Sequence, residues 1–354
     1  MVTVPESAPP TEPVTGWEAD GLDEKKATRN LWHGLIAMVV LVGMVVGLLL
    51  EVPGLHDVQQ QILRMPIGWV VLALALEVLS CMGYVVAFLQ VFERAPFRFG
   101  ARVALSELAF GAAVAVGGAG SVAVGAWLLI ERGAKPGRVA ERSAVLFLLT
   151  SGVNVITLAI AGLGAWLGIL PGSRDPLLTL VPGLVGVLTL VGFLSLPWFA
   201  QHFIVNRFEG RAARWALAIS DTIRETARLL FSADWRLVGA FGYLWFDIAV
   251  LWVCFRALGT TPPVAVVVLA YQIGYLSNLI PIPGGIGVLD GSFVGMFVLY
   301  HVNDTLATSA TIVYHAISLW VPATWGTIAF LLLRRSRNEP IKWRLKRGEQ
   351  PADS

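Results

Sequence analysis

Charged residues are scarce in this sequence. Only 14% of its 354 residues are Asp, Glu, Lys or Arg, whereas 56% are hydrophobic and the mean hydropathy is +0.70. Soluble domains carry roughly a quarter charged residues, so this composition excludes a water-soluble protein. The net charge of +2 also excludes the strongly basic surface of a nucleic-acid-binding protein.

Cysteine is scarce too, and enzyme motifs are missing. Cys81 and Cys254 each lie in an apolar stretch, without the spacing of a disulfide framework or a metal site. The sequence has no Walker loop, no Gly-x-Ser-x-Gly elbow and no His-Glu-x-x-His motif. We therefore expect no cofactor and no metal, and a transporter-like protein instead of a conventional enzyme.

Long apolar runs are what the sequence does contain. They lie at about 33–52, 67–91, 143–170, 177–200, 237–256 and 307–333, and each approaches the roughly 20 residues that cross a bilayer. Alternating barrel strands are absent, so the sequence predicts an all-α polytopic membrane protein. Residues 1–30 contain no apolar core of a secretory signal and are expected to form a disordered tail, with the first apolar run kept as an anchor.

The basic residues predict the orientation, because short cytoplasmic loops are enriched in Lys and Arg. Of the 26 basic residues, 23 fall in the tail before residue 30, in 94–102, 132–142 and 201–236, and in the tail after residue 333; only Arg64, Arg174 and Arg256 remain for the other side. Both termini are thus predicted to be cytoplasmic. Because 21 of the 26 basic residues are Arg, as in a GC-rich bacterial genome, we expect a bacterial inner membrane. Residues 336–354 form a basic tail, and the amphipathic segment at about 205–235 is expected to be an interfacial helix.

Two apolar segments then have both ends on one side of the membrane. Residues 103–131 enter from the cytoplasm and are interrupted by "GGAG" at 117–120, and residues 264–300 enter from outside and contain "PIPGGIG". We expect re-entrant helical hairpins, about six full spans in all, and for the first hairpin two short spans remain an alternative.

An internal repeat accompanies these hairpins. A shift of 167 residues places Gly117, Gly118 and Gly120 opposite Gly284, Gly285 and Gly287. The spans before the hairpins carry Glu77 and Asp247, 170 residues apart. Together with the topology, this predicts inverted repeats at about 67–170 and 237–333, which are typical of secondary transporters with a site near the midplane.

The candidate site residues follow from that pattern. Glycine permits close backbone approach, and proline frees carbonyl groups. The expected substrate-binding residues are therefore Gly117, Gly118, Gly120, Asn278, Pro281, Pro283, Gly284, Gly285, Gly287 and Asp290. Asp290 binds a proton, a cation or an amine head group in one interpretation, and only caps a helix start in the other.

Other polar residues have both a functional and a structural interpretation. Glu77 and Asp247 are candidates for proton or ion coupling, or alternatively hold helices together through Ser, Tyr or Trp partners. His315 is a proton switch with one of these acids, or a packed histidine. Arg132 and Arg142 attract a lipid phosphate, or simply follow the positive-inside rule.

The segments "NLIPIPGGIGVLDGSFVGMF" and "AVGGAGSVAVGAWLLIERGAKPGRVAERSAVLFLL" resemble the family named for the transmembrane region of lysylphosphatidylglycerol synthase, also called flippase-like. The resemblance covers roughly residues 30–335 and implies a flippase-like domain that moves aminoacylated phospholipids or polyprenyl-linked sugars between leaflets. Leu289 and Asp290 stand where the family commonly has Arg-Glu, and the first repeat lacks the usual Pro and basic residue around 115–124. The aminoacyltransferase domain of the synthases does not follow the last span, so we do not expect synthesis of that lipid.

Three hypotheses follow. The first is a translocase for an anionic phospholipid or polyprenyl-linked glycan. The second is a membrane-embedded transferase with a polyprenyl-phosphate donor, although the clustered loop acids of such enzymes are not evident. The third is a noncatalytic partner of an envelope glycosyltransferase or lipid-modifying enzyme, recruited through the tails.

Overall fold

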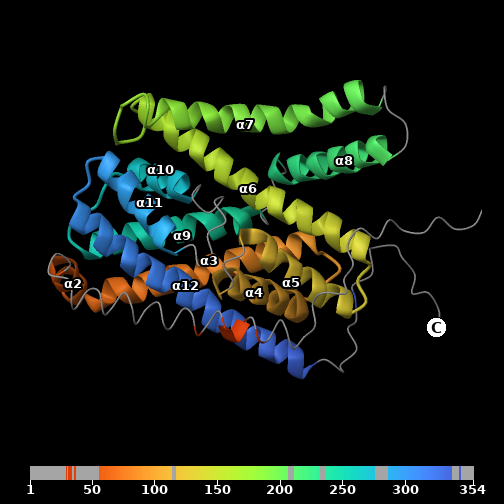
Figure 1. The fold of residues 1–354 in the computed structure, drawn as a ribbon, viewed down its shortest axis with the longest axis horizontal. Helices are drawn as coiled ribbons and strands as arrows, with labels where there is room; N and C mark the ends of the chain where they lie inside the picture. The colour runs from red at the N-terminus through yellow and green to blue at the C-terminus, as the bar shows by residue number, and fades with distance from the viewer. Residues whose placement is uncertain are drawn as a thin grey trace, which may run out of the picture.

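The computed structural model consists of helices over the part of the chain that it describes (Figure 1). The described residues are 29, 31–33, 36, 56–113, 117–205, 211–231, 237–275, 286–336 and 343. The helices are α2 (His56–Leu63), α3 (Ile67–Val91), α4 (Phe97–Ala113), α5 (Gly117–Glu131), α6 (Pro136–Trp166), α7 (Leu180–Phe199), the π-helix η3 (Ala200–Val205), α8 (Arg211–Phe231), α9 (Leu237–Ala257), α10 (Val264–Tyr275), α11 (Ile286–Leu299) and α12 (Asp304–Arg335).

Five described helices are long and apolar enough to cross a membrane, namely α3, α6, α7 continued into η3, α9 and α12. The all-helical membrane architecture expected from composition is therefore confirmed. The first apolar run, at about 33–52, lies almost entirely outside the described residues, so the expected number of full spans stays a prediction.

Local chemistry explains where the longest helices begin and end. Pro136 occupies the first turn of α6, where its missing N–H costs nothing, and Gly168, at φ +73°, follows the end of that helix. At the start of α12, the side chain of Asn303 accepts a hydrogen bond of 3.0 Å from the backbone N–H of Leu306.

The crossing of α3 and α9 forms the centre of the molecule. A Cβ on Gly83 would lie 2.4 Å from the backbone nitrogen of Tyr243, and a Cβ on Gly239 would lie 2.7 Å from Cγ1 of Val86. The missing side chains let the two backbones approach as small residues do in membrane helix pairs. Around this crossing pack α4, α10, α6 and α12.

Helix α7 lies at one edge of the molecule, with α8 beside it (Figure 1). It packs on α6 through Gly162 and Gly183, where a Cβ on Gly162 would lie 2.7 Å from the Cα of Gly183. Leu188 and Val191 are 68% and 58% exposed. An apolar, exposed face of this kind suits contact with lipid.

The connections between the helices lie at two opposite ends of the molecule. We call the first the basic end; it comprises the α3–α4 and α5–α6 connections and the end of α12, and Arg132 there donates to the carbonyl of Leu333 at 3.0 Å. The opposite end comprises α2, the α6–α7 connection and the α11–α12 turn, where the hydroxyl of Tyr300 donates to the carbonyl of Leu178 at 2.6 Å. The connections at the basic end contain the basic segments 94–102 and 132–142, which the sequence analysis assigned to one side of the membrane.

Candidate functional site

Two carboxyl groups meet at the crossing of α3 and α9. Glu77 of α3 and Asp247 of α9 are only 4% and 9% exposed, and their side chains lie within hydrogen-bonding range of each other. The sequence analysis predicts related positions for them in two repeats, 170 residues apart. The fold brings these two residues into contact inside the molecule.

Two tyrosines donate to one member of this pair. The hydroxyl of Tyr271, on α10, hydrogen-bonds to Oδ2 of Asp247. The hydroxyl of Tyr314, on α12, lies 3.1 Å from Oδ1 and 3.0 Å from Oδ2 of the same carboxyl group. By contrast, Oε2 of Glu77 is buried without a hydrogen-bond donor among the described residues. The two acids therefore have different surroundings, which favour a carboxylate at Asp247.

His315 stands beside this cluster, next to Tyr314 on α12. Its ring stacks on Phe293 of α11 with centroids 5.6 Å apart and lies 5.2 Å from the ring of Tyr314. It is 8% exposed and near enough to Asp247 to interact with that carboxyl group electrostatically. The structure thus places the predicted histidine with one of the predicted acids, and its role as a proton switch stays a prediction.

A third buried acid, Glu107 of α4, belongs to a separate contact. The hydroxyl of Tyr84 donates to its Oε2 at 2.7 Å, and the carboxyl group lies so close to α5 that a Cβ on Gly125 would come within 1.5 Å of Oε1. Glu107 is 2% exposed. It therefore contacts α3 through Tyr84 and α5 beside Gly125 in the interior.

The glycine-rich candidates lie mostly outside the described side chains. Asn278, Pro281, Pro283, Gly284 and Gly285 fall in 276–285, which the structure does not describe. Of the remaining candidates, the backbone alone is described: Gly117, Gly118 and Gly120 form the first turn of α5, and Gly287 and Asp290 lie in the first five residues of α11. Their substrate-binding role remains a prediction.

Arg132 is held by groups at the basic end. Besides its hydrogen bond to Leu333, its guanidinium group lies 5.8 Å from the ring centroid of Phe99, and the indole N–H of Trp343 donates to its backbone carbonyl at 3.1 Å. A small hollow of about 20 Å³ adjoins it, lined also by Trp127 and Arg334. The side chain thus has a structural role at the basic end, and its attraction of a lipid phosphate stays a prediction.

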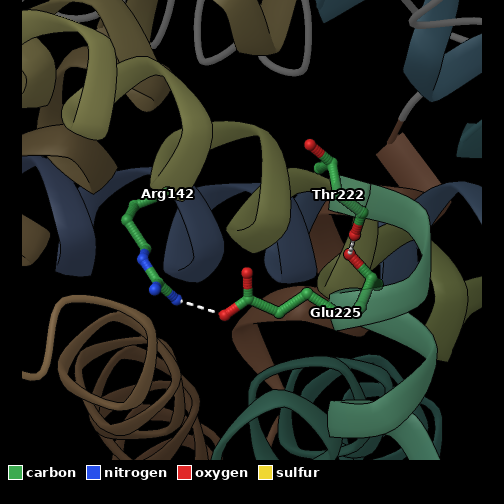
Figure 2. A network of polar contacts seen from close by, with 4 residues as sticks. Arg142, Thr222 and Glu225 are labelled. Carbon is green, nitrogen blue, oxygen red and sulfur yellow. Dashed lines mark hydrogen bonds and ion pairs between the residues drawn. The ribbon is translucent and has the colours of Figure 1, made fainter. Parts of the chain in front are cut away.

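Arg142 is held by an acid of α8. Its Nη1 lies 2.5 Å from Oε1 of Glu225 (Figure 2), and each side chain is about one third exposed, at 30% and 34%. On α8, the hydroxyl of Thr226 donates to the carbonyl of Thr222 at 2.8 Å. This ion pair joins α6 to α8.

The tyrosines are what sequence reasoning missed. The chain has only six, and Tyr84, Tyr243, Tyr271, Tyr275 and Tyr314 all lie within or beside the acid clusters. A usable signal was present, because each of these tyrosines interrupts an apolar stretch with a hydroxyl group that needs a partner when buried.

Comparison with known proteins agrees with the architecture. Residues 35–326 match the family described as the lysylphosphatidylglycerol synthase TM region. A UPF0104 membrane protein of Methanothermobacter thermautotrophicus (strain Delta H) is 34% identical over 84 residues, which cover 23% of this chain and 24% of the relative. The chain thus matches about a quarter of that relative's length. Because the family match extends over most of the sequence, this protein belongs to the lysylphosphatidylglycerol synthase transmembrane-region family.

Proposed function

We propose that this protein moves an anionic phospholipid or polyprenyl-linked glycan between the leaflets of a bacterial inner membrane, with the basic end in the cytoplasm. Its substrate passes between two inverted repeats. The glycine- and proline-rich segments that include Gly118 and Gly285 contact the head group, and basic side chains at the basic end gather the lipid.

The observation that carries this proposal is two pairs of short helices, one at each end of the molecule. The arms α4 and α5 pack together and begin and finish at the basic end, whereas α10 and α11 pack together at the opposite end. These helices have 17, 15, 12 and 14 residues, or about 25, 22, 18 and 21 Å at 1.5 Å per residue. All are shorter than a hydrocarbon core of roughly 30 Å, which supports two re-entrant hairpins.

The contacts between helices support the inverted repeat. If α3, α4, α5 and α6 correspond to α9, α10, α11 and α12, each contact has a counterpart. The contact of α3 with α4 corresponds to that of α9 with α10, α5 with α6 to α11 with α12, and α4 with α12 to α10 with α6. The contact between α3 and α9 is its own counterpart, and it contains Glu77 and Asp247, which lie within three residues of equivalent positions.

Close contacts inside the two hairpins support the same correspondence. In the first, Glu107 of α4 lies against Gly125 of α5. In the second, a Cβ on Gly274 of α10 would lie 2.2 Å from Cδ1 of Phe293 on α11. A shift of 167 residues aligns Glu107 with Gly274 and brings Gly125 within one residue of Phe293. The large and small partners are exchanged, but the site of closest approach is retained.

A vesicle assay tests the proposal. The purified protein is reconstituted, and the movement of labelled phosphoglycolipid and aminoacyl-phospholipid between leaflets is followed. We expect the wild-type protein to accelerate movement of at least one of these lipids. Gly285→Leu should abolish the acceleration, because a large side chain would block backbone approach at the predicted site. Asp290→Asn tests separately whether the carboxylate is required.

Gly295→Leu is the matched control, because a Cβ on this glycine of α11 meets nothing within 4 Å. It should move lipid as the wild type does. If the folded wild-type protein accelerated none of these lipids, the translocase proposal would be wrong. In that case, substitutions of the intramembrane polar residues that leave the protein's function in cells intact would favour recruitment of a partner through the tails. Transfer of a group from a polyprenyl-phosphate donor by the purified protein would favour the transferase hypothesis.

A further inference from the structure

We propose that Glu77 and Asp247 share one proton and that this shared-proton site couples lipid movement to a proton gradient. The coupling rests on the proposed translocation, whereas the proton site itself can be tested without any lipid substrate.

The pair requires a proton on chemical grounds. Ionised carboxylates only accept hydrogen bonds, so two carboxyl groups within hydrogen-bonding range of each other need a proton on one of them. Both side chains are at least nine-tenths buried, and two adjacent buried negative charges would repel each other strongly without water to screen them. The arrangement therefore holds one proton between two acids.

The hydrogen bonds assign that proton to Glu77. Asp247 accepts from the hydroxyl groups of Tyr271 and Tyr314, and two donors stabilise its ionised form. In the part of the chain that the structure describes, Glu77 has no such donor on its buried Oε2. In this arrangement the carboxylic acid of Glu77 donates to the carboxylate of Asp247.

Titratable groups surround the pair on several helices. Cys81 lies on α3, Tyr243 on α9, Tyr275 on α10 beside Tyr271, and His315 on α12 beside Tyr314. Glu107 of α4 has its own donor in Tyr84. The buried polar side chains of α6, Ser143 and Thr157, do not titrate, and the side chain of Asp290 on α11 is not described.

The position of the pair connects proton binding to movement. Each repeat contributes one acid, so the shared hydrogen bond exists only while α3 and α9 keep their present relation. When Glu77 releases its proton to water on one side, the two carboxylates repel each other and favour a different arrangement of the halves. A proton that arrives from the other side restores the pair, so one proton crosses in each cycle.

Infrared titration of the reconstituted wild-type protein is the first test. A carboxylic acid has a carbonyl stretch distinct from that of a carboxylate, and we expect this band to respond to external pH. Glu77→Gln should remove the contribution of the pair to this band, because its amide still donates to Asp247 but carries no acid proton. Glu107→Gln is the matched control, a buried glutamate outside the pair, and it should retain the band.

Lipid movement under imposed gradients is the second test. A proton gradient should accelerate movement by the wild type and by Glu107→Gln, but not by Glu77→Gln. A pH-responsive band without lipid movement would support the proton site and contradict translocation. Lipid movement that is indifferent to a proton gradient, or that follows a sodium gradient instead, would overturn the coupling. A band that stays fixed at every pH would show that the proton is only structural; this measurement needs no variant.

Discussion

Gly326 shows how one missing side chain sets the position of a whole helix. A Cβ at this position of α12 would lie 2.0 Å from the backbone carbonyl oxygen of Leu105 and 2.6 Å from Cβ of Ala109, both on α4. The carbonyl oxygen belongs to a helix backbone and cannot turn aside as a flexible side chain can. An alanine would therefore have to push α12 away from α4.

We expect Gly326→Ala to lower the free energy of unfolding by about 1–3 kcal/mol. The melting temperature of the detergent-solubilised protein should fall with it. Gly295→Ala is the control, since a Cβ there meets nothing within 4 Å and both changes bring the same gain in helix propensity. Thermal unfolding of the two variants beside the wild type measures the difference. Equal melting temperatures for both would contradict the close packing of α12 on α4.

At this scale the sequence predicted the acids better than their partners. An acid inside an apolar run is conspicuous, so Glu77 and Asp247 were identifiable, and their related positions in the predicted repeats indicated a relation between them. The tyrosines that donate hydrogen bonds to Asp247 come from α10 and α12. These two helices are distant from each other in sequence. Only the packing of four helices decides which hydroxyl group meets which acid, and no local pattern contains that information.

Helix boundaries show where hydropathy alone falls short. The apolar run at about 143–170 predicted a span, but α6 extends from Pro136 to Trp166. Its first two turns contain Arg138, Glu141 and Arg142, and hydropathy excludes these charged residues from a predicted membrane span. The helix continues through them because charged side chains are compatible with a helix once it leaves the bilayer, and Glu225 of α8 pairs with Arg142.

Labelling of single cysteines tests the direction of the helices. Glu93 and Lys135 are exposed residues that flank the hairpin of α4 and α5 at the basic end, whereas Arg174 and Thr260 are exposed in the connections at the opposite end. We expect a membrane-impermeant thiol reagent to modify Arg174→Cys and Thr260→Cys in intact cells. Glu93→Cys and Lys135→Cys should react only after the membrane is opened.

The native thiols give little background in this experiment, because Cys81 and Cys254 are 2% and 1% exposed. Reaction of Glu93→Cys and Lys135→Cys from opposite sides would contradict a re-entrant hairpin, since α4 and α5 together would then cross the membrane once. Uniform reaction of all four from the reverse sides would invert the orientation that the basic residues predict, but it would leave the hairpins intact.

For the molecule as a whole, the main contacts lie between the proposed repeats. The α3–α9, α4–α12 and α6–α10 interfaces all join one half to the other. By contrast, α7 and α8, which connect the halves in sequence, lie at the edge of the molecule (Figure 1). The covalent link is therefore not what holds the two halves in register. Packing of α3 on α9, made possible by Gly83 and Gly239, has that role.

If this is correct, the chain should assemble from two pieces. We expect residues 1–208 and 209–354, when co-expressed, to copurify through a tag on the first piece, because the interfaces between halves need no continuous chain. A break between Val153 and Asn154, inside α6, should prevent recovery of a stable complex, since it cuts a spanning helix. Gly83→Leu should also prevent copurification, because even its Cβ would meet the backbone of Tyr243 at 2.4 Å. Gly68→Leu on the same helix should not, since a Cβ there meets nothing within 4 Å. Two pieces that insert into the membrane but never copurify would show that the connection itself, and not the α3–α9 crossing, keeps Glu77 opposite Asp247.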